Sequence, residues 1–262
     1  MQCDMCRNEA ILFQPASGRN LCARHLIPDI EARAKRSIRS HHWMKTGDHI
    51  AVILSGDKKS AALLRFLQKL VSGRRDIRLS AVPAGDAEAG RHCLAAATRV
   101  ADSLGIPCIE MPRPGRTRGP DGDRVTRFAL AFTLDDIAQE VLVQFLSRNA
   151  EQIIHPHLPR SSTVPVICPF IAVPSDEADC YWDHEGTGTV LLPCVPARDP
   201  LTLETEDLFR DYQQRHPATG HALLNLAEEL SRCKVAEIAA SATVRNRPGP
   251  SIIITGVPDN GI

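Results

Sequence analysis

The sequence is poor in aromatic residues, has no net charge and contains no long apolar run. Aromatic side chains make up 4% of its 262 residues, which argues against a surface on which successive nucleic-acid bases stack. The 31 basic and 31 acidic side chains cancel, so the whole-chain charge does not favour a polyanionic partner. No apolar stretch approaches the roughly 20 residues of a membrane span.

The N-terminal segment also lacks the basic stretch and apolar core of a secretion signal. We therefore expect a cytoplasmic protein without a membrane partner. The nine cysteines are an odd number, and in a reducing compartment cysteines serve mainly as metal ligands or core residues.

Four metal-capable side chains lie close to the N-terminus. Cys3 and Cys6 are separated by two residues, fifteen residues follow, and Cys22 and His25 repeat the same spacing. Two such pairs on tight turns can close a tetrahedron around zinc. The alternative is a chance pairing of cysteines. The sequence predicts a structural zinc site that uses all four ligands.

The middle of the chain alternates between short apolar runs and amphipathic segments. Strands are predicted at 49–54, 77–82, 107–111 and 126–132, and helices after residue 56 and at 88–104 and 134–148. Further helices are predicted at 28–46, which is basic, and near 203–215 and 219–232. Strand–helix alternation predicts an α/β fold with a doubly wound parallel sheet.

We divide the chain into four parts on this basis. Residues 1–27 form the zinc-binding module, 28–47 a basic linker helix, and 48–150 the α/β core. Residues 151–262 hold the remainder of the core, the C-terminal helices and the tail.

The loop after the first core strand is a candidate anion site. Backbone N–H groups at the start of the following helix attract phosphate. Within it, Ser55, Lys58 and Ser60 add side-chain donors. The alternative is an ordinary polar turn between a strand and a helix.

The same loop resembles the S-G-G-x-D-S motif of the PP-loop (N-type) ATP pyrophosphatases. The chain is similar to one branch of that superfamily, the tRNA 2-thiolation enzymes of the TtuA and TtcA group. The resemblance rests on the segments 21–25, 47–56, 89–91, 104–107, 133–139, 165–177, Cys194 and 215–217, which follow the family order. It implies the PP-loop (HUP-like) fold behind an N-terminal zinc-finger module.

The resemblance also implies roles for particular residues. Cys194, Asp135 and Asp136 correspond to catalytic positions, the two aspartates closing the site and helping to hold Mg²⁺. The ATP-binding positions are Ser55, Gly56, Lys58, Lys59, Ser60 and Arg91. ATP and tRNA are the implied partners, and a second copy of the chain or a sulfur-carrier protein is left open as a further one.

Two departures from the family pattern qualify these roles. Asp57 replaces the second glycine of the loop and Lys59 replaces its aspartate, while the stretch 112–127 has arginines and no cysteine where the family has a cysteine pair. Because Cys194 alone cannot hold a cubane cluster, we expect no iron–sulfur cluster. Two hypotheses remain: an ATP-dependent tRNA thiolation-like transferase, or an inactive paralogue that binds nucleotide or RNA or regulates a partner.

The basic residues are the remaining candidate surface. The helix at 28–46 and the arginine-rich stretch 113–127 could contact a tRNA backbone. The alternative is that both are solvated faces.

Overall fold

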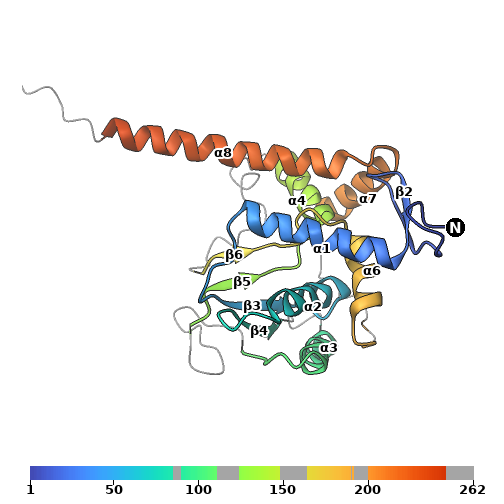
Figure 1. The fold of residues 1–262 in the computed structure, drawn as a ribbon. Coiled ribbons are helices and arrows are strands. Elements are labelled where there is room, and N and C mark those ends of the chain that lie inside the picture. The colour runs from blue at the N-terminus through green and yellow to red at the C-terminus, as the bar shows by residue number, and fades with distance from the viewer. Residues whose placement is uncertain (85–89, 111–123, 148–163, 190, 192–199, 246–262) are drawn as a thin grey trace, which may run out of the picture.

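A four-stranded parallel sheet forms the centre of the computed structural model (Figure 1), which describes residues 1–84, 90–110, 124–147, 164–189, 191 and 200–245, without the side chains of 90–91 and 233–245. Its strand order is β4-β3-β5-β6. The strands are β3 (His49–Leu54), β4 (Arg78–Pro83), β5 (Arg127–Ala129) and β6 (Val166–Ile167). A separate antiparallel hairpin, β1 (Leu12–Gln14) and β2 (Arg19–Leu21), lies near the N-terminus.

Seven helices are described around these sheets. They are α1 (Ala23–Ser40), α2 (Lys58–Val71), α3 (Gly90–Ser103), α4 (Leu134–Leu146), α6 (Ser175–Glu185), α7 (Pro200–Arg215) and α8 (Thr219–Arg245). Helix α8 continues well past the body of the molecule (Figure 1). None of the described helices is long and apolar enough to cross a membrane.

Both faces of the sheet are apolar, as a buried parallel sheet requires. Strand β3 shows the reason, because its side chains alternate between two clusters. Ile50, Val52 and Leu54 pack in the main core with residues of α1, α2 and α6. Ala51 and Ile53 face the opposite way, toward Val82 and Val125. The predicted α/β fold with a parallel sheet is therefore confirmed.

The strand predicted at 107–111 is wrong. Among the described residues of that segment, 107–110, a single bridge forms, between Cys108 and Ala81. Ala81 donates to the carbonyl of Pro107 and accepts from Ile109, but proline has no N–H with which to extend the ladder. The strand predicted at 126–132 is shorter, because Thr133 already caps helix α4.

The helix predicted at 28–46 begins earlier and ends earlier. Helix α1 starts at Ala23, with Cys22 as its N-cap, and ends at Ser40. His25 therefore lies in the first turn of α1, so the N-terminal ligand group and the helix share one continuous stretch of backbone.

Candidate functional site

The four N-terminal ligand candidates converge on one point. Cys3 Sγ lies 3.5 Å from His25 Nδ1, Cys6 Sγ lies 3.6 Å from Cys22 Sγ, and Cys22 Sγ lies 3.4 Å from His25 Nδ1. All four ligand atoms fall within 4.8 Å of one another. A tetrahedral zinc ion with Zn–S bonds of about 2.3 Å would separate its sulfur ligands by about 3.8 Å. The spacing of the donor atoms thus fits one bound metal ion.

Local backbone geometry explains this convergence. Cys6 N donates to Cys3 O at 3.3 Å, and His25 N donates to Cys22 O at 3.0 Å, so each pair sits on a tight turn. Burial raises the pKa of the Cys3 thiol, but hydrogen bonds from backbone amides outweigh it and lower this pKa to about 6. A lowered thiol pKa favours the thiolate that metals bind.

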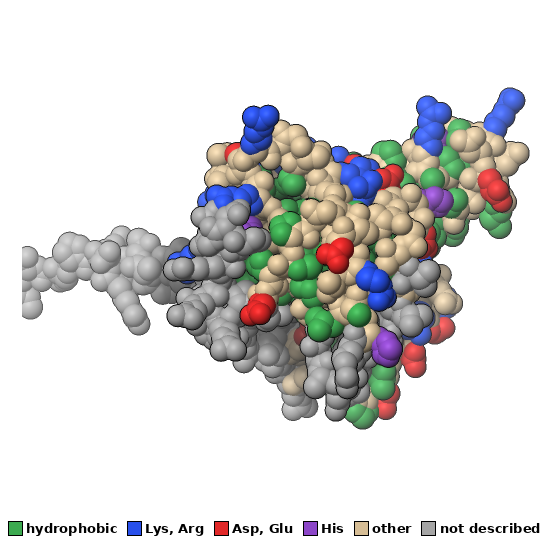
Figure 2. Space-filling model, turned by 90° about the horizontal axis from the view of Figure 1, so that it is seen from below, with side chains coloured by type: hydrophobic (Ala, Val, Ile, Leu, Met, Phe, Trp, Pro, Cys, Tyr) green, Lys and Arg blue, Asp and Glu red, His purple; other side chains and the backbone are tan. Residues whose placement is uncertain are grey.

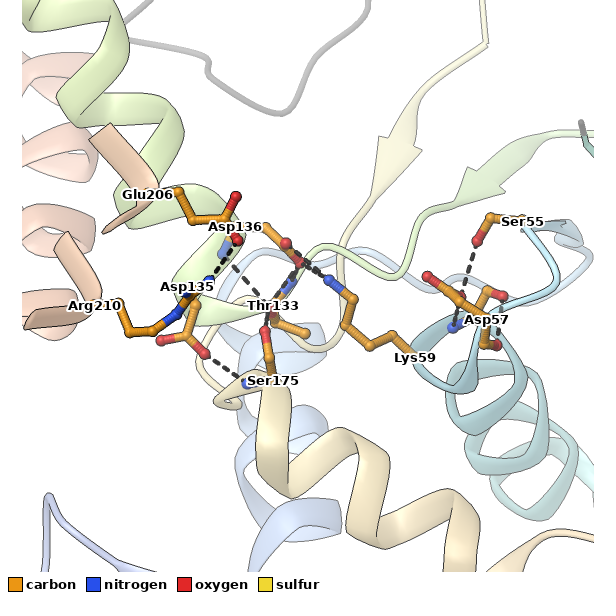
Figure 3. A network of polar contacts seen from close by, with 10 residues as sticks. Ser55, Asp57, Lys59, Thr133, Asp135, Asp136, Ser175, Glu206 and Arg210 are labelled. Atoms are coloured by element: carbon orange, nitrogen blue, oxygen red, sulfur yellow. Dashed lines mark hydrogen bonds and ion pairs between the residues drawn. The ribbon is translucent and has the colours of Figure 1, made fainter. Parts of the chain in front are cut away.

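The loop between β3 and α2 is the second candidate site. Gly56 has a φ of 85°, and a Cβ there would lie 2.5 Å from the carbonyl oxygen of Cys93 in α3. Only glycine fits this position. Asp57 then caps α2: its Oδ1 accepts from the backbone N–H of Ser60 at 2.9 Å and from Ser55 Oγ at 2.9 Å (Figure 3).

Each of the two lysines of the loop forms an ion pair with an aspartate of another element. Lys59 Nζ donates to both carboxylate oxygens of Asp136, at 2.8 and 2.9 Å (Figure 3). Burial alone would lower the pKa of Lys59, but the nearby Asp136 carboxylate outweighs it and the pKa is raised. Lys58 Nζ lies 2.7 Å from Asp183 on α6, and this ion pair also raises the pKa of Lys58.

Asp136 and Asp135 have different neighbours although they are adjacent in sequence. Asp136 completes a capping box with Thr133 at the start of α4 and faces Lys59. Asp135 accepts from the backbone N–H of Ser175 at 2.6 Å and from Gln213 Nε2 at 2.9 Å. Figure 3 shows Asp135 directed toward α6, away from the loop. The structure therefore brings Asp136, but not Asp135, to the candidate phosphate site.

Two further predicted site residues cannot be placed. Arg91 belongs to α3, but its side chain lies outside the described part of the chain, and Cys194 lies outside the described residues altogether. Their roles stay predictions.

Sequence reasoning missed two acidic residues of α6 that face the loop. Asp183 pairs with Lys58, and burial raises the pKa of Asp179, against the pull of Lys58 and Lys59. The only signal in the sequence was the acidic start of this helix, because its packing against α2 is a tertiary contact.

A buried polar cluster joins the N-terminal hairpin to α6. Glu177 is 1% exposed and forms an ion pair with Arg33 of α1. It also accepts a 3.0 Å hydrogen bond from Gln14 of β1. Burial raises the pKa of Glu177, while Arg33 opposes the rise. Because Ser175 at the start of α6 contacts Thr133 and Asp135, one helix contacts both the N-terminal hairpin and the start of α4.

Lys and Arg side chains do not gather on the face seen from below. Figure 2 shows them there singly, among hydrophobic and acidic side chains of the described residues. Of the basic stretch 113–127, residues 113–123 lie outside the described residues, while Arg124 is exposed and Arg127 forms an ion pair with Asp48. Helix α1 exposes three arginines, Arg24, Arg36 and Arg39.

Comparison with known proteins supports the resemblance stated above. No protein-family model matches the chain. It is 21% identical to the tRNA 2-thiolation protein NcsA of Haloferax volcanii, over 93% of this chain and 91% of that protein. It superposes with a TM-score of 0.70 on the U34-tRNA thiolase NcsA from Methanococcus maripaludis, with 18% identity, covering 88% of this chain and 87% of the other. The resemblance to the tRNA thiolation branch of the PP-loop superfamily is confirmed.

The same comparison corrects one expectation. The solved thiolase is described with its 4Fe-4S cluster, so our expectation that this chain has no iron–sulfur cluster is wrong. That expectation counted only the cysteines missing from 112–127. It ignored the group Cys3, Cys6, Cys22 and His25, which could itself supply ligands to a cluster.

Proposed function

We propose that this chain is a tRNA thiolation-like protein that binds ATP in the cleft beside β3 and activates a uridine or related acceptor base of tRNA. The observation that carries this proposal is the meeting of the loop 55–60 with Asp136. Both follow the carboxyl ends of parallel strands, β3 and β5, which is where open α/β sheets bind their ligands.

The proposed chemistry assigns a role to each part of the cleft. The N–H groups in the first turn of α2, with Lys58 and Lys59, would hold the ATP phosphates. Asp136 would hold Mg²⁺ when Lys59 turns to the phosphates. Adenylylation of the base releases pyrophosphate and leaves a carbon that a sulfur nucleophile can attack. Cys194 stays the predicted thiol for that step.

We also propose that α1 contributes to tRNA binding. Its exposed Arg24, Arg36 and Arg39 lie on a single helix that starts at the metal ligands. Arginines placed in this way neutralise backbone phosphates and release counterions. Binding that weakens steeply with rising salt would support this assignment.

The N-terminal group is proposed to hold a metal centre. Its donor spacing fits a single zinc ion, and the relative with a 4Fe-4S cluster makes such a cluster the second candidate. Metal analysis together with the visible absorption spectrum of anaerobically purified protein separates the two, because zinc is colourless and iron–sulfur clusters absorb near 400 nm.

A second candidate function is a catalytically inactive paralogue that binds tRNA or regulates a partner. One observation favours it: the side chains of Ser55, Lys58 and Lys59 are all engaged by carboxylates of the chain itself. Because these donors are already bound to carboxylates, they are available to a triphosphate only when those contacts break.

Pyrophosphate release with ATP and bulk tRNA tests the proposal. We expect tRNA-dependent release by the wild type and clearly slower release by Ser60→Ala, since Ser60 lies in the first turn of α2, where the proposed phosphate site is. The matched control is Ser72→Ala, at the exposed other end of the same helix. Binding of tRNA without any release would favour the inactive paralogue, and equal release by Ser60→Ala would contradict the assignment of the loop.

A further inference from the structure

We propose that Asp57 is a built-in counter-anion, which fills the phosphate position of the loop and selects against free polyphosphates in the absence of tRNA. This inference rests on the proposed function, because it concerns the same cleft. It assigns to Asp57 a role in specificity, in addition to the phosphate-binding roles proposed for Ser55, Lys58 and Lys59.

The position of the Asp57 carboxylate is the first argument. One oxygen, Oδ1, accepts both from the Ser60 amide and from the Ser55 hydroxyl, each at 2.9 Å. These are two of the donors that a bound phosphate would use in such a loop. No other acidic residue lies in the first turn of α2. The carboxylate therefore takes the place that the helix N-terminus offers to an anion.

The charges around the loop are the second argument. Lys58 and Lys59 are the two cations of the loop, and each already contacts a carboxylate, Asp183 and Asp136. Asp57 and Asp179 also lie within electrostatic range of Lys59. Among the described side chains of this cleft, these two lysines and four carboxylates carry a formal charge of −2. A polyphosphate entering it meets net repulsion.

Asp57 also competes directly with a phosphate for the Ser60 amide and the Ser55 hydroxyl, in addition to repelling it. Asp57 is covalently attached beside its two donors, so it competes at a high effective concentration. A phosphate must first displace it, and the freed carboxylate then remains next to the phosphate. A glycine at this position would leave the donors open.

Binding of inorganic pyrophosphate and of ATP, measured by titration calorimetry on the metal-replete full chain without tRNA, tests the proposal. Asp57→Asn removes the charge but keeps a residue that caps helices equally well. Asp57→Gly removes the cap as well. We expect both variants to bind pyrophosphate about tenfold more tightly than the wild type, or better still.

The charge-matched control is Asp76→Asn. Asp76 pairs with Arg74 just before β4, at the amino-terminal end of the parallel strands and so opposite the loop, and its loss removes one negative charge without touching the loop. We expect its pyrophosphate affinity to equal that of the wild type. Circular dichroism of each variant establishes that the fold is retained.

Three results would overturn the proposal: equal affinity in wild type and Asp57→Asn, weaker binding in Asp57→Asn, or no binding by any of the proteins. The outcome is separate from that of the function assay. Tighter pyrophosphate binding by Asp57→Asn, with no tRNA-dependent release by the wild type, would support the counter-anion and contradict the transferase.

Discussion

The side-chain amide of Gln14 donates a 3.0 Å hydrogen bond to the carboxylate of Glu177, which lies 163 residues further along the chain. Gln14 belongs to the hairpin between the two pairs of candidate metal ligands, and Glu177 belongs to α6, which also carries the partner of Lys58 in the candidate phosphate loop. Arg33 completes the cluster from α1. The N-terminal hairpin and the loop after β3 are therefore both in contact with α6.

Glu177→Gln should destabilise the protein by about 3 kcal/mol, because the largely buried guanidinium of Arg33 loses its buried counter-charge and keeps an ion pair only with the more exposed Asp29, beside a hydrogen bond to the carbonyl of Ala172. Urea unfolding monitored by circular dichroism measures this change. Asp211→Asn is the control, since it breaks an exposed pair with Arg215, and pairs of this kind contribute about 0.5 kcal/mol. Equal losses in the two variants would contradict the importance of the cluster.

Cys6→Ser should lower the metal content of the purified protein by roughly tenfold or more, because one of four ligands is lost. Inductively coupled plasma mass spectrometry measures zinc and iron in the same sample. Cys108→Ser is the matched control, because this thiol is exposed and far from the ligand group. An unchanged metal content in Cys6→Ser would remove Cys6 from the ligand set.

Gly56→Ala should destabilise the protein by roughly 2–4 kcal/mol, because the residue has a φ of 85° and its new Cβ would meet the Cys93 carbonyl at 2.5 Å. Gly73→Ala provides the comparison, since a Cβ there meets nothing within 4 Å. We expect that variant to stay within about 1 kcal/mol of the wild type. Thermal unfolding of both variants measures the difference. An unchanged stability in Gly56→Ala would mean that the loop and α3 can move apart at little cost in free energy.

Asp48 should contribute to stability at neutral pH and lose that contribution in acid. The residue is 7% exposed, lies directly before β3, and its carboxylate accepts a hydrogen bond from Arg127 Nε at 2.8 Å. Burial raises its pKa, but the hydrogen bonds from Arg127, Lys45 and Thr126 outweigh burial and lower it below the ordinary value of 3.8.

The sign of the pH effect follows from that shift. With the folded pKa depressed, the stabilisation is fully present above pH 3.8 and disappears as the pH falls through the folded pKa. Asp48→Asn should therefore cost about 2 kcal/mol at pH 7 and progressively less below pH 4. Urea unfolding at pH 7 and below pH 4 measures this difference in the free energy of unfolding, with Asp207→Asn, a substitution at an exposed residue, as control. A cost that does not depend on pH would contradict the account.

The sequence by itself determined the features that depend on local geometry. The spacing of Cys3, Cys6, Cys22 and His25 was enough to predict their convergence, because two turns and one helix start fix most of it. The short apolar run of β3 and the amphipathic pattern of α2 were also sufficient, since a buried strand followed by a helix with one apolar face is recognised without knowledge of a distant partner.

Only the tertiary structure decided what the loop contacts. The pairing of Lys59 with Asp136 spans 77 residues, and that of Gln14 with Glu177 spans 163. No local pattern specifies such contacts, because they depend on how β5 and α6 pack beside β3. The failed strand at 107–111 has the same cause: its apolar residues suited a strand, but Pro107 and a single bridge to Ala81 left no ladder to join.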